Sequence, residues 1–337
     1  MKRAIIPCLM ASVVLAGCGG AGSDDESAPS QPSEPTTSAT APTLPSGVTP
    51  IVSGLSGSDI CAVVPATPSG YWVLGCSGTV TEVTQAGEKA PHARLDDSPA
   101  VVGALQLLGG KAVLPIQHGV EGEHLTYAVG LFDTATGTVS GQAELGDSAI
   151  KSVDVIDDVA YVATFDGDIV AYQPTDPNVV AVTKFPKPLN AASAGAGAVW
   201  GVSGDGVVSR FVVADKTTGS FTDKALRKAS LSAVVQDDLW VASVSKETLA
   251  KVGKAGTVTA LDVPGSTISM ATCGDSVWLA QSHLRGKYGS TPGLKQLSLD
   301  GSVKATYEVK VGIGSLACAS DGSVVGVAGD GTLVGAT

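Results

Sequence analysis

Short apolar stretches that alternate with polar residues recur from about residue 49 to residue 337, and Gly, Asp and Ser separate them. Each repeat holds a stretch of the form apolar-aromatic-Val-Ala between two such turns. Alternation of period two predicts β-strands, and small polar residues predict tight turns. No segment has a competing helical period. The aromatic or equivalent position of successive repeats falls at Trp72, Val113, Tyr161, Trp200, Trp240, Trp278 and Val325.

The third repeat shows the pattern most clearly. Asp157-Asp158 and Asp166-Gly167 provide two of its turns, because Asp and Gly tolerate the positive φ that tight hairpins require. The predicted strands span residues 150–155, 159–164, 169–172 and 179–184.

Seven repeats of about 41 residues, each with four antiparallel strands, predict an all-β fold, a seven-bladed β-propeller. A β-sandwich is the alternative, and the regular repeat disfavours it. The last repeat leaves room for only three strands before residue 337. We expect residues 50–55 to supply its outer strand, so that this N-terminal strand closes the ring.

Individual repeats resemble a known group of propellers. The segments Asp238-Leu-Trp-Val-Ala and Gly274-Asp-Ser-Val-Trp-Leu-Ala resemble repeats of streptogramin-lyase-like and YVTN propellers, and Asp133-Thr-Ala-Thr-Gly137 is similar to the turn of quinoprotein-type repeats. The resemblance implies the blade, which carries enzymes, scaffolds and binding modules alike. Lyases of this kind work with a metal and with His and Glu side chains near the channel mouth. No residues of this sequence are assigned to those roles.

The N-terminus predicts export. Lys2 and Arg3 precede the uncharged residues 4–16, a stretch too short to cross a bilayer as a helix. Leu15-Ala16-Gly17-Cys18 resembles the lipobox of bacterial lipoproteins, which implies removal of residues 1–17 and acylation of Cys18, for example by palmitate. An ordinary signal peptide with an unrelated cysteine is the alternative. We expect a lipid-anchored protein on the extracytoplasmic side of a cell membrane.

Composition separates the anchor from the folded region. Residues 18–48 comprise the lipidated Cys18 and a tether of mainly Ser, Thr, Pro, Ala and Gly without aromatic residues, which cannot form a core. The propeller is expected to span residues 49–337. The whole chain has 32 acidic and 21 basic residues, a net charge of −11, and loss of Lys2 and Arg3 makes it −13. This charge argues against nucleic-acid binding, and we expect a monomer.

Four of the six cysteines fall in the propeller. An even number in an exported protein predicts disulfides, and four cysteines allow three pairings. We favour Cys61–Cys76, on the first two strands of one blade, and Cys273–Cys318, at equivalent ends of neighbouring inner strands. No C-x-x-C spacing supports a zinc site or a reactive thiol.

Two repeats carry long loops between their second and third strands, and together these loops hold three of the four histidines. Both loops should rise from one face, and binding residues are often found on loops of rigid scaffolds. The alternative is ordinary solvent-exposed loops. A metal held by the residues of the first loop is chemically allowed, but their spacing matches no established site, so we predict no cofactor. The candidate ligand-binding residues are His118, Glu121, Glu123 and His124 in the first loop, and His283, Arg285, Lys287 and Tyr288 in the second.

The sequence therefore favours a binding module whose loop-bearing face contacts an envelope protein or another surface ligand. No phosphate-binding loop, catalytic serine elbow or H-E-x-x-H motif is present. The alternatives are a metal-dependent lyase or hydrolase that uses the two loops, and an envelope assembly scaffold. The tryptophan series is interpreted as packing between blades and not as a sugar-binding stripe.

Overall fold

The computed structural model describes residues 46–337, except 56–59, 67–68, 85, 93–94, 96–97, 100–104, 120–123, 174–175, 283–291, 310–311 and 320–321. Strands dominate these residues, which also hold two three-residue 3-10 helices, η2 (Lys224–Leu226) and η3 (Val244–Lys246). Within this part of the chain, no helix has the length and apolar character needed to span a membrane. The predicted signal peptide and lipidated Cys18 lie outside the described residues.

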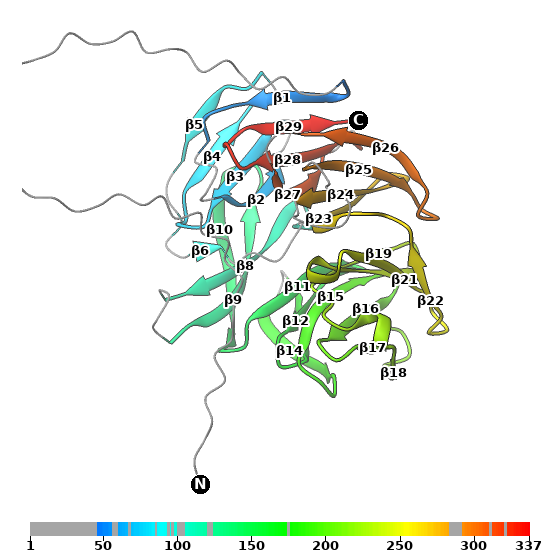
Figure 1. The fold of residues 1–337 in the computed structure, drawn as a ribbon. Helices are drawn as coiled ribbons and strands as arrows, with labels where there is room; N and C mark the ends of the chain where they lie inside the picture. Colours follow the sequence, from blue (N-terminus) through cyan, green and yellow to red (C-terminus); the bar gives the residue numbers. More distant parts are fainter. Residues whose placement is uncertain are drawn as a thin grey trace, which may run out of the picture. The chain divides into compact units, whose positions relative to one another are not determined.

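The described residues form seven antiparallel sheets that follow one another around a ring (Figure 1), as the sequence predicts. We number the sheets as blades in chain order. The first strands of successive blades lie side by side along the ring axis, and β2 of blade 1 contacts β27 of blade 7. The first three blades contain β2 (Ile60–Pro65), β3 (Tyr71–Gly75), β4 (Val80–Val83) and β5 (Lys89–Pro91); β6 (Ser98–Pro99), β7 (Leu107–Leu108), β8 (Lys111–His118), β9 (Thr126–Asp133) and β10 (Thr138–Gly146); and β11 (Ile150–Ile156), β12 (Val159–Thr164), β13 (Asp168–Gln173) and β14 (Asp176–Lys184).

The other four blades repeat this order with short connections. Blade 4 contains β15 (Leu189–Gly195), β16 (Ala198–Ser203), β17 (Val207–Val212) and β18 (Thr217–Thr222), and blade 5 contains β19 (Leu231–Val235), β20 (Asp238–Ser243), β21 (Thr248–Val252) and β22 (Val258–Leu261). Blade 6 contains β23 (Ser266–Cys273), β24 (Ser276–Ser282), β25 (Gly293–Ser298) and β26 (Val303–Glu308), and blade 7 contains β27 (Ile313–Cys318), β28 (Val324–Ala328), β29 (Leu333–Ala336) and β1 (Val48–Val52).

Blade 3 confirms the four strands predicted from the repeat, with ends that differ by at most three residues. Asp157 and Asp158 both have positive φ, 47° and 59°, as a two-residue hairpin turn requires. Blade 2 differs from the simple pattern, because β6 and β7 both pair with β8 and together replace a single first strand.

The N-terminal strand closes the ring. β1 pairs with β29 in an antiparallel register that places Val48 opposite Ala336. The prediction of a closing strand is confirmed, but the strand begins and ends earlier than the expected residues 50–55. Pro50 is tolerated because this strand is the outer edge of its sheet. Gly54 adopts φ 74° and lies beyond the strand end at Val52.

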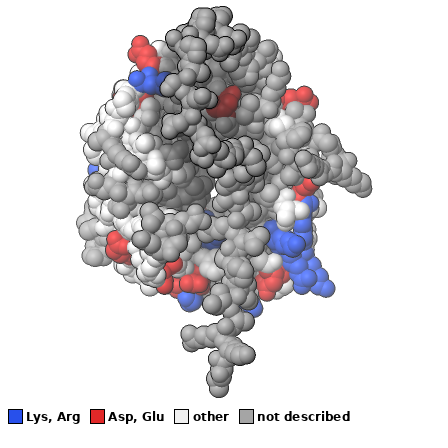
Figure 2. All heavy atoms as spheres, turned by 60° about the vertical axis from the view of Figure 1, so that its left-hand side comes forward, with Lys and Arg blue, Asp and Glu red and all other residues white. Residues whose placement is uncertain are grey.

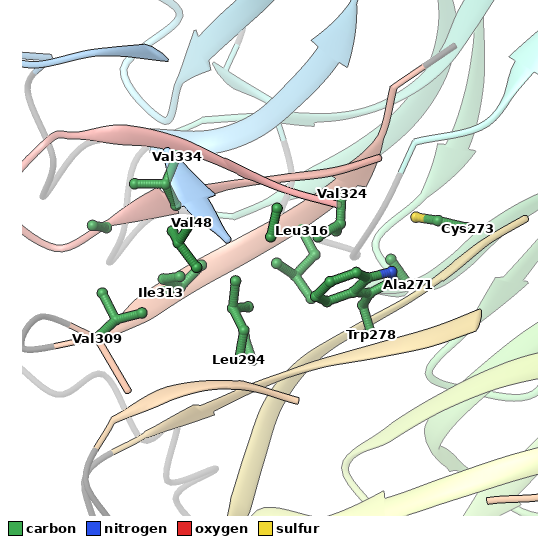
Figure 3. Close-up of a cluster of buried hydrophobic side chains, with 13 residues drawn as sticks. Val48, Ala271, Cys273, Trp278, Leu294, Val309, Ile313, Leu316, Val324 and Val334 are labelled. Carbon is green, nitrogen blue, oxygen red and sulfur yellow. The ribbon is translucent and has the colours of Figure 1, made fainter. Parts of the chain in front are cut away.

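Among the described residues, one cluster of buried apolar side chains lies between each pair of adjacent blades. Figure 3 shows the cluster between blades 6 and 7, where Trp278 packs near Leu316 and Val324 and where Val48 of the closing strand joins the same core. All seven residues at the aromatic position of the repeat are buried. The prediction that this position serves packing between blades is confirmed.

Both predicted disulfides are present. Cys61 pairs with Cys76 inside blade 1, with a Cα–Cα distance of 4.9 Å. Cys273 pairs with Cys318 at 5.4 Å and links the first strands of blades 6 and 7. The first bond ties a hairpin together, whereas the second joins two neighbouring blades.

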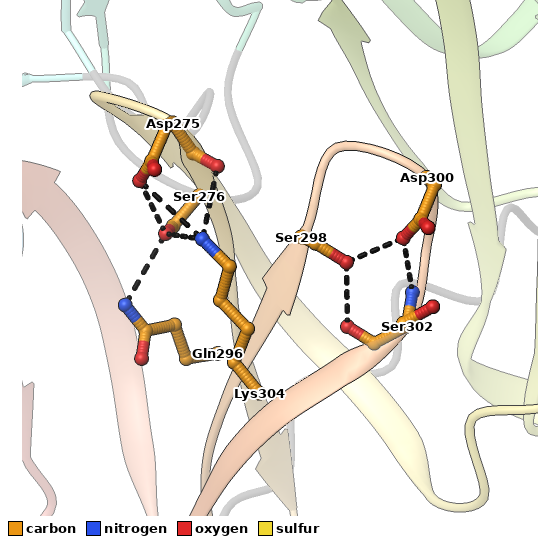
Figure 4. Close-up of polar contacts among 7 residues, drawn as sticks. All are labelled: Asp275, Ser276, Gln296, Ser298, Asp300, Ser302 and Lys304. Atoms are coloured by element: carbon orange, nitrogen blue, oxygen red, sulfur yellow. Dashed lines mark hydrogen bonds and ion pairs between the residues drawn. The ribbon is translucent and has the colours of Figure 1, made fainter.

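Aspartates in the turns bind their own backbone or nearby hydroxyls. In blade 6, Asp300 accepts hydrogen bonds from the Ser298 hydroxyl and from the Ser302 amide at 2.9 Å (Figure 4). These bonds lower the pKa of Asp300 to about 2. Asp275, in another turn of the same blade, contacts Lys304 at 3.4 Å (Figure 4). These contacts stabilise the turns in which the aspartates lie.

Candidate functional sites: the loop face and the central cavity

The first strand of each blade begins on the side of the ring where the second strand ends. Ile150 pairs with Thr164 in blade 3, and Ser266 pairs with Ser282 in blade 6. We call this side the loop face, because the predicted long loops join second to third strands. The first loop leaves β8 after His118, and the second leaves β24 after Ser282. Both loops therefore start from the loop face.

The described residues of the first loop place its two histidines differently. His118 is the last residue of β8, and its Nε2 lies 3.4 Å from Oε1 of Glu144 on β10 of the same blade. His124 is exposed. Glu121 and Glu123 lie outside the described residues, so the predicted group of four is placed only in part.

In the second loop, the candidate residues His283, Arg285, Lys287 and Tyr288 also lie outside the described residues. The structure does show the base of this loop. Gln281 Nε2 donates a 3.0 Å hydrogen bond to the carbonyl of Pro264, and Lys295 Nζ donates to the same carbonyl at 2.5 Å. Burial lowers the pKa of Lys295. A partly buried ammonium group therefore lies where this loop leaves the ring.

The first strands enclose a cavity of about 650 Å³ on the ring axis, and every blade contributes to its lining. Asp154 and Lys151 of β11 are the only charged residues among the described residues of this lining, which includes no aromatic side chain. Serine hydroxyls, short alanines and a few aliphatic side chains form most of the wall. The cavity is therefore lined by a mixture of polar and apolar groups and carries little charge.

Asp154 is 8% exposed and accepts hydrogen bonds from both neighbouring blades. Gln106 Nε2 of blade 2 donates to Oδ1 at 3.0 Å, and the Ala194 amide of β15 donates to Oδ2 at 2.8 Å. Burial raises the pKa of Asp154 to about 7, although the Ala194 amide and the nearby Ser152 hydroxyl act in the opposite direction. The cavity wall thus holds a carboxyl group that titrates near neutral pH.

The same kind of contact recurs around the cavity. Gln106 Oε1 accepts from the Val155 amide at 2.9 Å, and Ser193 Oγ accepts from the Val234 amide at 3.2 Å. Ser269 Oγ accepts from the Leu316 amide at 3.2 Å. A first strand is the inner edge of its sheet, where amides lack a partner strand. Side chains of one blade satisfy these amides in the next blade and stabilise the ring.

The sequence reasoning did not identify Asp154 as a candidate. It lies directly opposite Tyr161 in the β11–β12 pair, and Ser193 lies opposite Trp200 in the equivalent pair of blade 4. Blades 5 and 6 have Ala233 and Ala271 there. Asp154 could have been recognised in an alignment of the repeats, because blades 4, 5 and 6 have Ser or Ala at the same position.

The described residues contain no group of three or more His, Cys, Asp or Glu side chains that could hold a metal ion. Acidic and basic side chains are interspersed on the face seen in Figure 2, and several of them lie next to each other. In the part of the chain that the structure describes, the loop face and the cavity are the features that could bind a ligand.

The sequence matches no protein-family model and no curated protein. Solved structures share the fold: a streptogramin B lyase has 10% identity and a TM-score of 0.65 over 86% of this chain and 97% of its own. A chain of a mitotic checkpoint complex has 12% identity and a TM-score of 0.64 over 89% and 96%. BamB from Moraxella catarrhalis has 13% identity and a TM-score of 0.52 over 82% of each chain. At these identities the likeness shows the seven-bladed propeller and no activity.

Proposed function

We propose that this protein is a lipid-anchored binding module on the extracytoplasmic side of a cell membrane, and that its loop face binds an envelope protein. The observation that carries the proposal is the departure of both long loops from one face of a ring closed by its own N-terminal strand. Binding residues are often found on loops, because a rigid scaffold holds such loops in position.

Two further observations support the proposal. Two disulfides suit an oxidising compartment outside the cytosol. The mitotic checkpoint complex includes a chain of the same fold, so a propeller of this size can serve in a protein assembly. The tether that precedes β1, residues 19–47, would hold the ring clear of the membrane.

The test is cross-linking of the full-length protein in its own cells, followed by affinity recovery. One variant replaces residues 120–123 and 283–291 with Gly/Ser segments and keeps His118. A matched control changes residues 254–255, in a turn between β21 and β22 on the opposite face, to Ser-Ser. We expect a protein partner that the control retains and the loop variant loses.

A partner that both variants retain would assign binding to another surface and support a scaffold. A metal-dependent activity on a small substrate that His118→Ala or His283→Ala abolishes would replace the proposal with a lyase or hydrolase. The anchor has its own test, because Cys18→Ser should move the protein from the membrane fraction to the soluble fraction.

A further inference from the structure

The central cavity has the size of a small-molecule site, and the described residues of its lining belong to the first strands and their flanks. Its volume of about 650 Å³ lies within the range of roughly 300–1,000 Å³ that is typical of ligand pockets. A binding site here is independent of any protein partner on the loop face, and this inference therefore goes beyond the proposed function.

Asp154 still has acceptor capacity toward the cavity. An ionised carboxylate offers about four lone-pair positions, and Gln106 Nε2, the Ala194 amide and the Ser152 hydroxyl use three of them. The remaining position suits a donor that carries a positive charge, since a buried carboxylate gains most from such a partner. Lys151 is not the obvious partner, because its Nζ lies 5.3 Å over the ring of Phe165.

A hydroxyl group in the wall also lacks a partner. Ser232 Oγ is buried and makes no hydrogen bond of good geometry with any described residue. Ser232 lines the cavity. Buried polar atoms without partners are rare in folded proteins and indicate a group that completes them.

These observations exclude several ligand classes. A buried carboxylate disfavours an anion such as phosphate. The described lining has no aromatic ring on which a flat ligand could stack. No set of three metal ligands occurs among the residues that the structure places.

We propose that the cavity binds a small aliphatic amino alcohol, with its ammonium group on Asp154 and its hydroxyl groups on serine hydroxyls of the cavity wall. The ammonium group supplies the charged donor that Asp154 can accept. The hydroxyl groups both donate and accept, so they can complete a hydroxyl without a partner such as that of Ser232.

The probes are 2-amino-1,3-propanediol and glycerol, which have the same shape and differ only in an ammonium group against a hydroxyl. Ligand-observed NMR titration of the full-length protein at pH 7.5 should give a Kd in the millimolar range or tighter for the amine, and binding at least tenfold weaker for glycerol. Asp154→Asn should weaken amine binding at least tenfold. Asp168→Asn, an exposed control on β13 of the same blade, should change it less than twofold.

The pH dependence gives a second readout that a merely structural role of Asp154 would not produce. Because the ammonium group binds the ionised carboxylate, amine binding should be at least tenfold tighter at pH 8 than at pH 5.5, and this difference should vanish in Asp154→Asn. Tryptophan fluorescence would verify that the variant is folded. Equal binding of the two probes, amine binding that survives Asp154→Asn, or no binding at 20 mM amine would each overturn the proposal.

Discussion

The fold should lose stability between pH 4 and pH 8 because of one side chain, Asp154. Its carboxyl group has a pKa of about 7 in the folded chain, against 3.8 as the ordinary value. Below about pH 4 the carboxyl group is protonated in the folded and in the unfolded chain, so it does not change the free energy of unfolding with pH. Between pH 4 and 7 the unfolded chain releases the proton while the folded chain keeps it, so the free energy of unfolding falls.

The expected loss is about 4 kcal/mol, because each unit between the two pKa values corresponds to 1.36 kcal/mol. The loss ends above about pH 7, where the folded state ionises as well. Among the described residues that line the cavity around Asp154, Lys151 is the other charged residue, and the facing residues of β15 and β19 are uncharged.

The measurement is urea unfolding of the full-length protein, followed by the fluorescence of its four buried tryptophans, from pH 4 to pH 8. Asp154→Asn removes the titration. At pH 4 the variant should be less stable by about 1–3 kcal/mol, because both oxygens of the protonated carboxyl group can still accept from the two donors that face it, whereas the amide nitrogen of Asn cannot accept from either. At pH 8 it should equal or exceed the parent protein.

The comparison between the two proteins cancels every other titrating group. Asp168→Asn, at an exposed carboxylate paired with Lys184, is the control. Its free energy of unfolding should differ from that of the parent by the same amount at every pH from 4 to 8. If the difference between Asp154→Asn and the parent changes by less than about 0.5 kcal/mol over this range, the carboxyl group titrates as in the unfolded chain and the argument from burial is wrong.

Three further changes test the ring itself. Replacing Cys273 and Cys318 with Ser should lower the free energy of unfolding in urea by about 4 kcal/mol, against about 3 kcal/mol for loss of the disulfide within blade 1. The Cys273–Cys318 bond contributes more because it closes a longer loop, with a separation of 45 residues against 15. An equal effect of reductant on the stability of the Ser variant and of the parent would contradict this. Val48→Asp places a charge in the core between blades 6 and 7 and should lower the free energy of unfolding by about 3–5 kcal/mol. An unchanged free energy of unfolding would show that β1 does not close the ring. Gly137→Ala should lower the free energy of unfolding by at least about 1 kcal/mol and shift the tryptophan emission, because Gly137 has φ 70° and an added Cβ would lie 2.8 Å from the Trp72 ring. Unchanged stability and emission would refute this packing.

The sequence predicted the fold well because a blade is a local object. Alternation, turn residues and one aromatic position repeat within about 41 residues. Cys61–Cys76 follows from the hairpin of one blade, and Cys273–Cys318 follows from equivalent positions in neighbouring repeats. The cavity is different, since seven strands that are distant in the sequence form it. Asp154 carries no neighbouring motif and differs from its counterparts Ser193 and Ala233 only when the blades are aligned.

Blade 2 shows a second limit. Its first strand is replaced by two short pieces, β6 and β7, which are too short for a period to be visible. Gln106, which bridges Asp154 and the Val155 amide, lies next to β7. A residue that is placed by the neighbouring blade, and not by its own strand, leaves no pattern in the local sequence.

The strand that closes the ring also sets the order of events during synthesis. Val48 needs Ala336 as its neighbour, and the two residues are at opposite ends of the folded region. Ribosomes add roughly 5–20 residues per second, so β1 must wait about 15–60 s after it is made until β29 exists. During that time its apolar side chains have no partner, and an exported chain would need to be kept from pairing wrongly. Loss of β29 would leave both ends of the ring open, so the ring can close only after β29 has been made.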